Sequence, residues 1–107
     1  MNIFSLFKSA SAVELKKFAA SLTDDLVKRY PPELDNKPGK QVSVTRLTRI
    51  IEDMCQRVVE FQASHKLGWI GKSRLANNVQ WALKDRGYTK KFVDFATEAV
   101  VVHLNKP

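Results

Sequence analysis

Three side chains of this sequence have the chemistry of metal ligands or nucleophiles: Cys55, His65 and His103. A structural zinc site takes four sulfur or nitrogen ligands, usually in closely spaced pairs, and a catalytic thiol needs a base beside it. These residues are too few and too widely spaced, so we expect no metal site and no nucleophilic cysteine. We expect the histidines to contact carbonyls near their helix ends or to fill the core, and the thiol to pack as a small apolar group.

The segment Gly71-Lys72-Ser73 is similar to the end of a phosphate-binding loop. Such a loop needs another glycine five residues before Gly71, where this chain has Lys66, and it follows a buried strand. Residues 61–67 instead continue a helical pattern. We therefore interpret Ser73 as a helix cap, and we expect no nucleotide cofactor.

Two pairs of adjacent carboxylates, Asp24-Asp25 and Glu52-Asp53, are the remaining candidates for acid–base chemistry. Neighbours on a helix point about 100° apart, so the members of each pair cannot share a proton or flank one bond. No other catalytic arrangement is suggested by spacing. The sequence therefore predicts a protein that is not an enzyme.

A basic tract is the strongest functional signal. Between Phe61 and Phe92 the only acid is Asp85, and the basic residues are Lys66, Lys72, Arg74, Lys84, Arg86, Lys90 and Lys91. Aromatic side chains interleave with them, a composition that is typical of surfaces that follow a phosphate backbone and stack on bases. A solvated, soluble surface is the competing interpretation.

The first helix is predicted at 12–30. Ser11 and Glu14 have the spacing of a capping box, and apolar residues then recur at three- and four-residue steps until Pro31-Pro32. The outer face pairs Asp24 with Lys28 and Asp25 with Arg29 at i,i+4 spacing. Residues 31–42 hold three of the four prolines and are predicted to be a loop.

Ser43 is predicted to cap a second long helix that Gly68 ends. Its buried face is given by Leu47, Ile51, Met54, Val58, Phe61 and His65. Arg49, Asp53 and Arg57 are expected to form an i,i+4 charge ladder on the opposite side.

Two further helices are predicted at 73–86, capped by Ser73 and ended by Gly87, and at 89–105, capped by Thr89. Apolar residues cover more than half of the last helix, so we expect it to be the central, most enclosed element. Val100-Val101-Val102 could alternatively form a short strand with residues 41–44, but two short strands are marginal.

These two helices have the lengths of a helix-turn-helix around Gly87-Tyr88. Asp94 and Glu98 would face phosphates on the recognition helix, and Arg86 stands where an apolar residue is expected. These features disfavour a sequence-reading helix-turn-helix.

A helical wheel places Leu75, Val79 and Leu83 on the inner face of the 73–86 helix, with Ala82 and the stem of Arg86. Trp81 falls on the opposite side, which also carries Asp85. The predicted partner-binding residues are Arg74, Asn77, Asn78, Trp81 and Lys84. Alternatively, Trp69 or the N-terminal segment covers Trp81, which then extends the core.

Length, composition and charge limit the fold and the function that the chain can have. The chain has 107 residues, 44% of them hydrophobic and 27% charged, and a net charge of +7. The length predicts one domain, and the patterns above predict that it is an all-α bundle of four helices. A short amphipathic helix at 1–9 is expected to pack Phe4 and Phe7 against the domain or a second subunit. A lone cysteine and the absence of an apolar run of about 20 residues predict a cytoplasmic protein without a membrane span. We expect a non-enzymatic module that binds a protein or a second copy of itself; nucleic-acid binding through the phosphate contacts of the 66–91 tract is the alternative.

Overall fold

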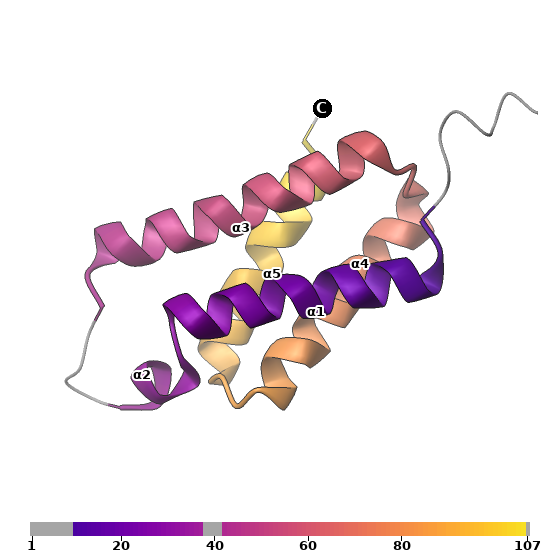
Figure 1. Cartoon of the computed structure of the whole chain (residues 1–107). Coiled ribbons are helices and arrows are strands. Elements are labelled where there is room, and N and C mark those ends of the chain that lie inside the picture. Colours follow the sequence, from indigo (N-terminus) through magenta and orange to yellow (C-terminus); the bar gives the residue numbers. More distant parts are fainter. Residues whose placement is uncertain (1–9, 38–41, 107) are drawn as a thin grey trace, which may run out of the picture.

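The structure, a computed structural model, describes residues 10–37 and 42–106. These residues form five α-helices and no strand (Figure 1). The helices are α1 (Ala12–Arg29), α2 (Pro32–Asn36), α3 (Val44–Ser64), α4 (Gly68–Asp85) and α5 (Lys90–Leu104). The predicted all-α fold is confirmed, and helix replaces the alternative strand at 100–102. The helix predicted at 1–9 lies outside the described residues.

The caps predicted for α1 and α3 are present. The Oγ of Ser11 accepts a hydrogen bond from the Glu14 N–H at 3.1 Å, and the Glu14 carboxylate accepts one from the Ser11 N–H at 3.2 Å. The Oγ of Ser43 accepts from the Arg46 N–H at 3.1 Å. Each cap pairs a backbone N–H that has no partner within its own helix, and so fixes where the helix begins.

The segment predicted to be a loop, 31–42, contains α2. Pro32 is its first residue, a position where the fixed φ of proline suits a helix and its missing N–H removes no bond. Prolines that end α1 therefore also start α2. The Nδ2 of Asn36, the last residue of α2, donates at 2.8 Å to the carbonyl of Gly87, which ties α2 to the turn before α5.

The boundary between α3 and α4 differs from the prediction. The earlier helix ends at Ser64, and Gly68 is the first residue of α4 rather than the end of α3. Gly68 has a φ of +61°, which glycine adopts without steric penalty, so the chain reverses sharply there. Ser73, predicted to be a cap, lies inside α4, and residues 69–71 are helical.

The turn between α4 and α5 follows the prediction. Gly87 has a φ of +93°, in the left-handed region expected after a helix end. The Oγ1 of Thr89 accepts a hydrogen bond from the Phe92 N–H at 3.2 Å and caps α5. Gly87 and Thr89 together reverse the direction of the chain, so that α5 packs against α4.

Four helices build the core. In Figure 1, α1 and α3 run in opposite directions in front of α4 and α5. The closest packing joins α1 with α4, α4 with α5, and α3 with α5. The least exposed core side chains are Val58, Leu75, Leu83, Val93, Ala96 and Val100. Each of these helices turns one side toward the shared core, and the other side of the helix is left at the surface.

Ion pairs link different helices instead of forming the predicted i,i+4 ladders. Arg29 of α1 pairs with Asp53 of α3 at 2.7 Å, and Arg57 of α3 pairs with Asp25 of α1. Asp24 pairs with Arg86, which follows α4. The predicted ladders are wrong because α1 packs beside α3 and α4, which brings these charges closer to other helices than to their own neighbours.

The expectation that α5 is the most enclosed helix is confirmed by its share of buried residues, five of fifteen, which is larger than in any other described helix, but one side of α5 is open. Phe95 and Val102 have exposed fractions of 51% and 50%. The helix packs chiefly against α3 and α4, and a third side remains open. Its wide apolar face therefore exceeds what the core of this chain uses.

Candidate binding surface on α4

The inner face of α4 is the one that the helical wheel predicts. Leu75, Val79 and Leu83 have exposed fractions of 1% or less. Ala82 is half-buried beside them. Arg86, expected to add its stem to this face, is exposed and pairs with Asp24. Gly71, the other buried residue of α4, lies four residues before Leu75 on the same face, so the described core contacts of α4 come from this one face.

Trp81 lies on the opposite side of α4 with an exposed fraction of 55%. Within the described residues Trp81 does not extend the core, and Trp69, which is itself 79% exposed, does not cover it; the N-terminal segment, the other cover considered, lies outside these residues. The Lys84 ammonium nitrogen lies 4.9 Å from the centre of the indole ring, within the range of a cation–π interaction. An aromatic ring with a cation over it is thus presented to solvent.

Three- and four-residue steps along α4 align Trp81 with further exposed side chains. We use the term α4 surface for the exposed residues Ile70, Arg74, Asn77, Trp81 and Lys84. Four of them are predicted partner-binding residues. The fifth, Ile70, has an exposed fraction of 53% and was missed because the helix was expected to begin at Ser73. The predicted residue Asn78 is half-buried, because it lies three residues after Leu75 on the flank toward the core.

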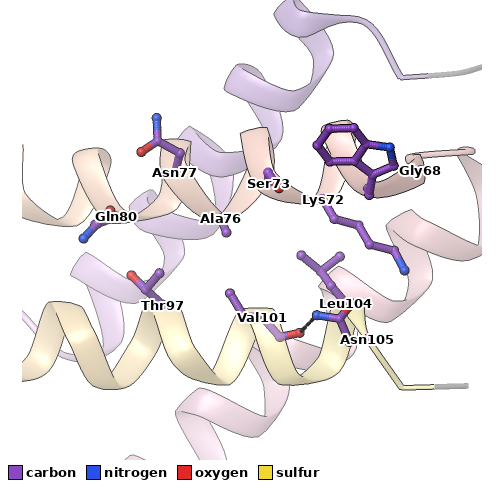
Figure 2. Close-up of a pocket in the computed structure, with 11 residues that line it drawn as sticks. Gly68, Lys72, Ser73, Ala76, Asn77, Gln80, Thr97, Val101, Leu104 and Asn105 are labelled. Carbon is purple, nitrogen blue, oxygen red and sulfur yellow. Dashed lines mark hydrogen bonds between the residues drawn. The ribbon is translucent and has the colours of Figure 1, made fainter.

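A groove of about 520 Å³ separates α4 from α5 on one flank of this surface (Figure 2). It is lined by Gly68, Trp69, Lys72, Ser73, Ala76, Asn77, Gln80, Thr97, Val101, Leu104 and Asn105. Asn77 belongs to both the α4 surface and the groove, so the two are continuous. No pattern in the sequence predicts the groove, because the groove depends on how α4 and α5 cross.

The groove combines an aromatic edge with polar walls. Trp69 has an exposed fraction of 79%, and Lys72 is the only charged residue among the described residues that line the groove. Figure 2 shows the Lys72 side chain extending toward the end of α5 that carries Asn105, and Thr97 pointing toward α4. Within the described part of the chain, the buried Oγ1 of Thr97 has no hydrogen-bond partner. The groove therefore favours neutral or anionic polar groups.

The basic tract is not gathered on one face. Arg86 and Lys90 are ion-paired, with Asp24 and with Asp94 respectively. Lys72 lines the groove, and Lys84 lies over Trp81 outside it. The remaining members, Lys66, Arg74 and Lys91, are exposed. The structure thus divides the tract among the groove, the α4 surface, α5 and the connections before and after α4.

The histidines make the carbonyl contacts expected of them. The Nδ1 of His65 lies 3.1 Å from the Phe61 carbonyl oxygen, and that of His103 lies 2.8 Å from the Ala99 carbonyl oxygen. The His65 ring also stacks on Phe61, with ring centres 4.1 Å apart. Residues 10–37 and 42–106 contain no group of three potential metal ligands.

Cys55 is a buried thiol with an exposed fraction of 1%. Burial raises its pKa to about 11, with a small opposing effect from the positive charge of Lys106. A thiol with a raised pKa carries little thiolate at neutral pH, and the thiolate is the reactive form. Cys55 therefore acts as a packing residue, as expected.

A cluster around Tyr30 and Tyr88 was missed by sequence reasoning. The Tyr88 hydroxyl donates to the Tyr30 carbonyl at 2.6 Å, and the Tyr30 hydroxyl donates to Asp35 at 3.1 Å. The second Asp35 oxygen accepts the Thr89 N–H at 2.7 Å. Burial and the bond to Asp35 raise the pKa of Tyr30 to about 12, and burial also raises that of Tyr88. Every polar group of this cluster binds another part of the fold, so it joins α1, α2 and α5.

Comparisons with known proteins give no relative: no family model, no curated protein and no solved structure matches this chain.

Proposed function

We propose that this chain is a non-enzymatic binding module whose α4 surface engages a protein partner. One observation carries the proposal: Trp81 is 55% exposed on a helix whose described core contacts come from its inner face. Tryptophan and arginine are enriched among the residues that dominate the binding energy of protein interfaces. The α4 surface combines both types: Arg74 lies about one turn before Asn77, and Trp81 lies about one turn after it. One partner segment can therefore contact both side chains.

The charges of the α4 surface indicate the chemistry of the partner. Arg74 and Lys84 place positive charge on both sides of Asn77, and Ile70 adds apolar area at one end. The surface therefore suits an apolar or aromatic side chain flanked by carboxylates. Asn77 supplies donors and an acceptor for a backbone amide between them.

The described titratable groups with the largest pKa shifts support a non-enzymatic role. Tyr30 and Tyr88 hydrogen-bond to other elements of the fold, and Cys55 packs in the core. Catalytic groups with shifted pKa values usually line a cleft that a substrate can enter. None of these three residues lines the groove between α4 and α5.

The proposal is tested by cross-linking in the cells that produce this protein. A photoreactive amino acid replaces Asn77 on the α4 surface, and in a control it replaces Lys17, which is exposed on α1. We expect one protein to be captured from position 77 and not from position 17. Adding Trp81→Ala should abolish the capture. Equal capture from both positions, or capture that survives Trp81→Ala, contradicts the proposal.

Nucleic-acid binding through the basic tract is the second candidate, favoured by Trp69. Its ring is 79% exposed at the edge of a groove that holds Lys72 and, in the ranges the structure describes, no acidic lining residue. Exposed aromatics beside cations bind single strands by stacking and phosphate contacts. This candidate predicts that labelled random-sequence single strands bind far more weakly at about 200 mM than at about 50 mM salt. Lys72→Ala should weaken binding and Lys16→Ala should not; an affinity that does not depend on salt excludes this function.

We also propose that the protein acts in the cytoplasm. The sequence has one cysteine, and its thiol is buried, so the fold does not depend on an oxidising compartment. Separately, none of the helices in the described ranges has both the length and the apolar character of a membrane span. Fractionation of the producing cells tests the location; recovery with an extracytoplasmic fraction contradicts it.

A further inference from the structure

The outward side of α5 carries a second regular pattern, distinct from the α4 surface. Four exposed residues recur at steps of four, three and four: Lys91, Phe95, Glu98 and Val102. This spacing keeps them on one face of the helix, and we call them the α5 stripe. Its order is basic, apolar, acidic, apolar.

The apolar members of the α5 stripe lie outside the described core, although the Phe95 ring touches the core residue Phe92. The core residues of α5 are Phe92, Val93, Ala96, Val100 and Leu104. Phe95 and Val102 remain 51% and 50% exposed. An exposed phenylalanine and valine aligned on one helix face resemble the apolar positions of a helix–helix seam.

The charged members of the α5 stripe make it complementary to itself. Lys91 stands four residues before Phe95 and Glu98 three residues after it, and neither has an ion-pair partner among the residues described. When two copies of α5 pack antiparallel, Lys91 of each copy faces Glu98 of the other, and the Phe95 rings meet near the two-fold axis. Val102 of each copy then faces the turn at Gly87 of the other copy, so Phe95 is the apolar centre of the contact. A parallel pair would place like charges opposite each other. The pattern therefore selects the antiparallel arrangement.

The charge of the whole chain also favours α5 as the contact between copies. Each copy carries a net charge of +7, so two copies repel across most of their surfaces. On α5, Lys90 and Lys91 are balanced by Asp94 and Glu98, and the Lys90 ammonium already binds Asp94 at 2.8 Å. The α4 surface is basic, so two copies of it would repel. A second copy of this chain consequently fits α5 and not α4.

We propose that this protein forms an antiparallel homodimer through the α5 stripe. The dimer places Phe95 at the centre of the interface, with a Lys91–Glu98 pair on each side. This proposal is independent of the partner proposed for the α4 surface, which lies on another helix.

Charge reversal tests the proposal. The dimer dissociation constant is measured by sedimentation equilibrium for the full chain, Lys91→Glu, Glu98→Lys and the double variant. By symmetry, each single reversal creates two like-charge contacts, so we expect each to raise the dissociation constant at least about tenfold. The double variant restores opposite charges and should return to within about threefold of the original chain.

Matched controls separate local pairing from net charge. Lys17→Glu on α1 and Glu52→Lys on α3 make the same charge changes at exposed positions outside the α5 stripe, and they should change the dissociation constant by less than about threefold. Phe95→Ser should prevent dimerisation, and circular dichroism should show that its helices are retained. A chain that remains monomeric up to about 1 mM overturns the proposal. A double variant as weak as either single variant also overturns it.

Discussion

The ammonium nitrogen of Lys84 lies 4.9 Å from the centre of the Trp81 ring, on the side of α4 that faces away from the core. At an exposed site such a cation–π contact contributes about 0.5–1 kcal/mol, too little to explain why a tryptophan is there. It does favour one orientation of the ring before any partner arrives. Because ordering a side chain on binding costs free energy, a ring held in this way binds with a smaller entropic loss.

The hydroxyl of Tyr88 should matter more for stability than that of Tyr30. It makes a buried hydrogen bond of 2.6 Å to the Tyr30 carbonyl, whereas the Tyr30 hydroxyl makes a partly buried bond of 3.1 Å to Asp35. Tyr88→Phe removes the donor from a buried carbonyl, so we expect a loss of about 1–3 kcal/mol in the free energy of unfolding. Tyr30→Phe should cost less. Urea denaturation measures both, and a larger loss for Tyr30→Phe contradicts the assignment.

Stability should fall in alkaline solution because three buried groups hold their protons more tightly when folded. The pKa of Cys55 is raised from 9.0 to about 11 and that of Tyr30 from 10.0 to about 12; the pKa of Tyr88 is also raised. Their contribution is fully present below the unfolded-state pKa values and is lost as pH rises through the folded values. We expect the free energy of unfolding to decrease between about pH 9 and 12.

Two variants separate these contributions. Cys55→Ala should flatten the decrease between about pH 9 and 11, and Tyr30→Phe should flatten it between about pH 10 and 12. The measurement is urea denaturation at a series of pH values. A slope against pH that neither variant changes shows that the raised pKa values of Cys55 and Tyr30 do not affect stability.

Arg57 should contribute more to stability than a surface arginine does. Its guanidinium hydrogen-bonds to Asp25 and, at 2.8 Å, to Ser21, and it lies 5.5 Å from the centre of the Phe18 ring. We expect Arg57→Ala to lower the free energy of unfolding by about 1–2 kcal/mol, because both helix pairing and packing on the ring are lost. Arg49→Ala, at an exposed arginine of the same helix, is the control and should have almost no effect. Equal losses in the two variants argue against this bridging role.

Local sequence signals predict the helix ends that depend on nearby residues. The caps at Ser11, Ser43 and Thr89 each involve an N–H only three residues away, so the sequence contains the whole interaction. Gly87 is equally local, because its left-handed conformation follows directly from the missing Cβ.

Sequence signals that are compatible with two different structures lead to wrong predictions. Proline both ends α1 and opens α2 at Pro32, and the positive φ of Gly68 suits the start of α4 as well as the end of α3. Asp25 stands four residues from Arg29, but each pairs with α3 instead. Which of two available partners a charge takes depends on helix packing, and spacing within one helix does not contain that information.

The binding surface also combines features that follow from local sequence with features that depend on helix packing. Arg74, Asn77, Trp81 and Lys84 share one side of α4 because helical periodicity alone places them there. Ile70 was missed with the start of the helix. The groove beside Lys72 and Thr97 exists only because α5 crosses α4 at a particular position. Packing of the core determines that position, and the amphipathic pattern of either helix alone does not predict it.

The most direct test of the α4 surface is a paired measurement on Trp81→Ala, of its melting temperature and of its affinity for the protein captured by cross-linking. Because the ring is 55% exposed, we predict a melting temperature within about 3 °C of the original chain. We also predict a loss in binding of about 2 kcal/mol or more, as for other truncated anchor residues. Leu83→Ala, at a fully buried position of the same helix, should show the reverse, with a large fall in melting temperature and intact binding by the folded fraction. A Trp81→Ala variant that melts much earlier while its folded fraction binds normally would contradict the account.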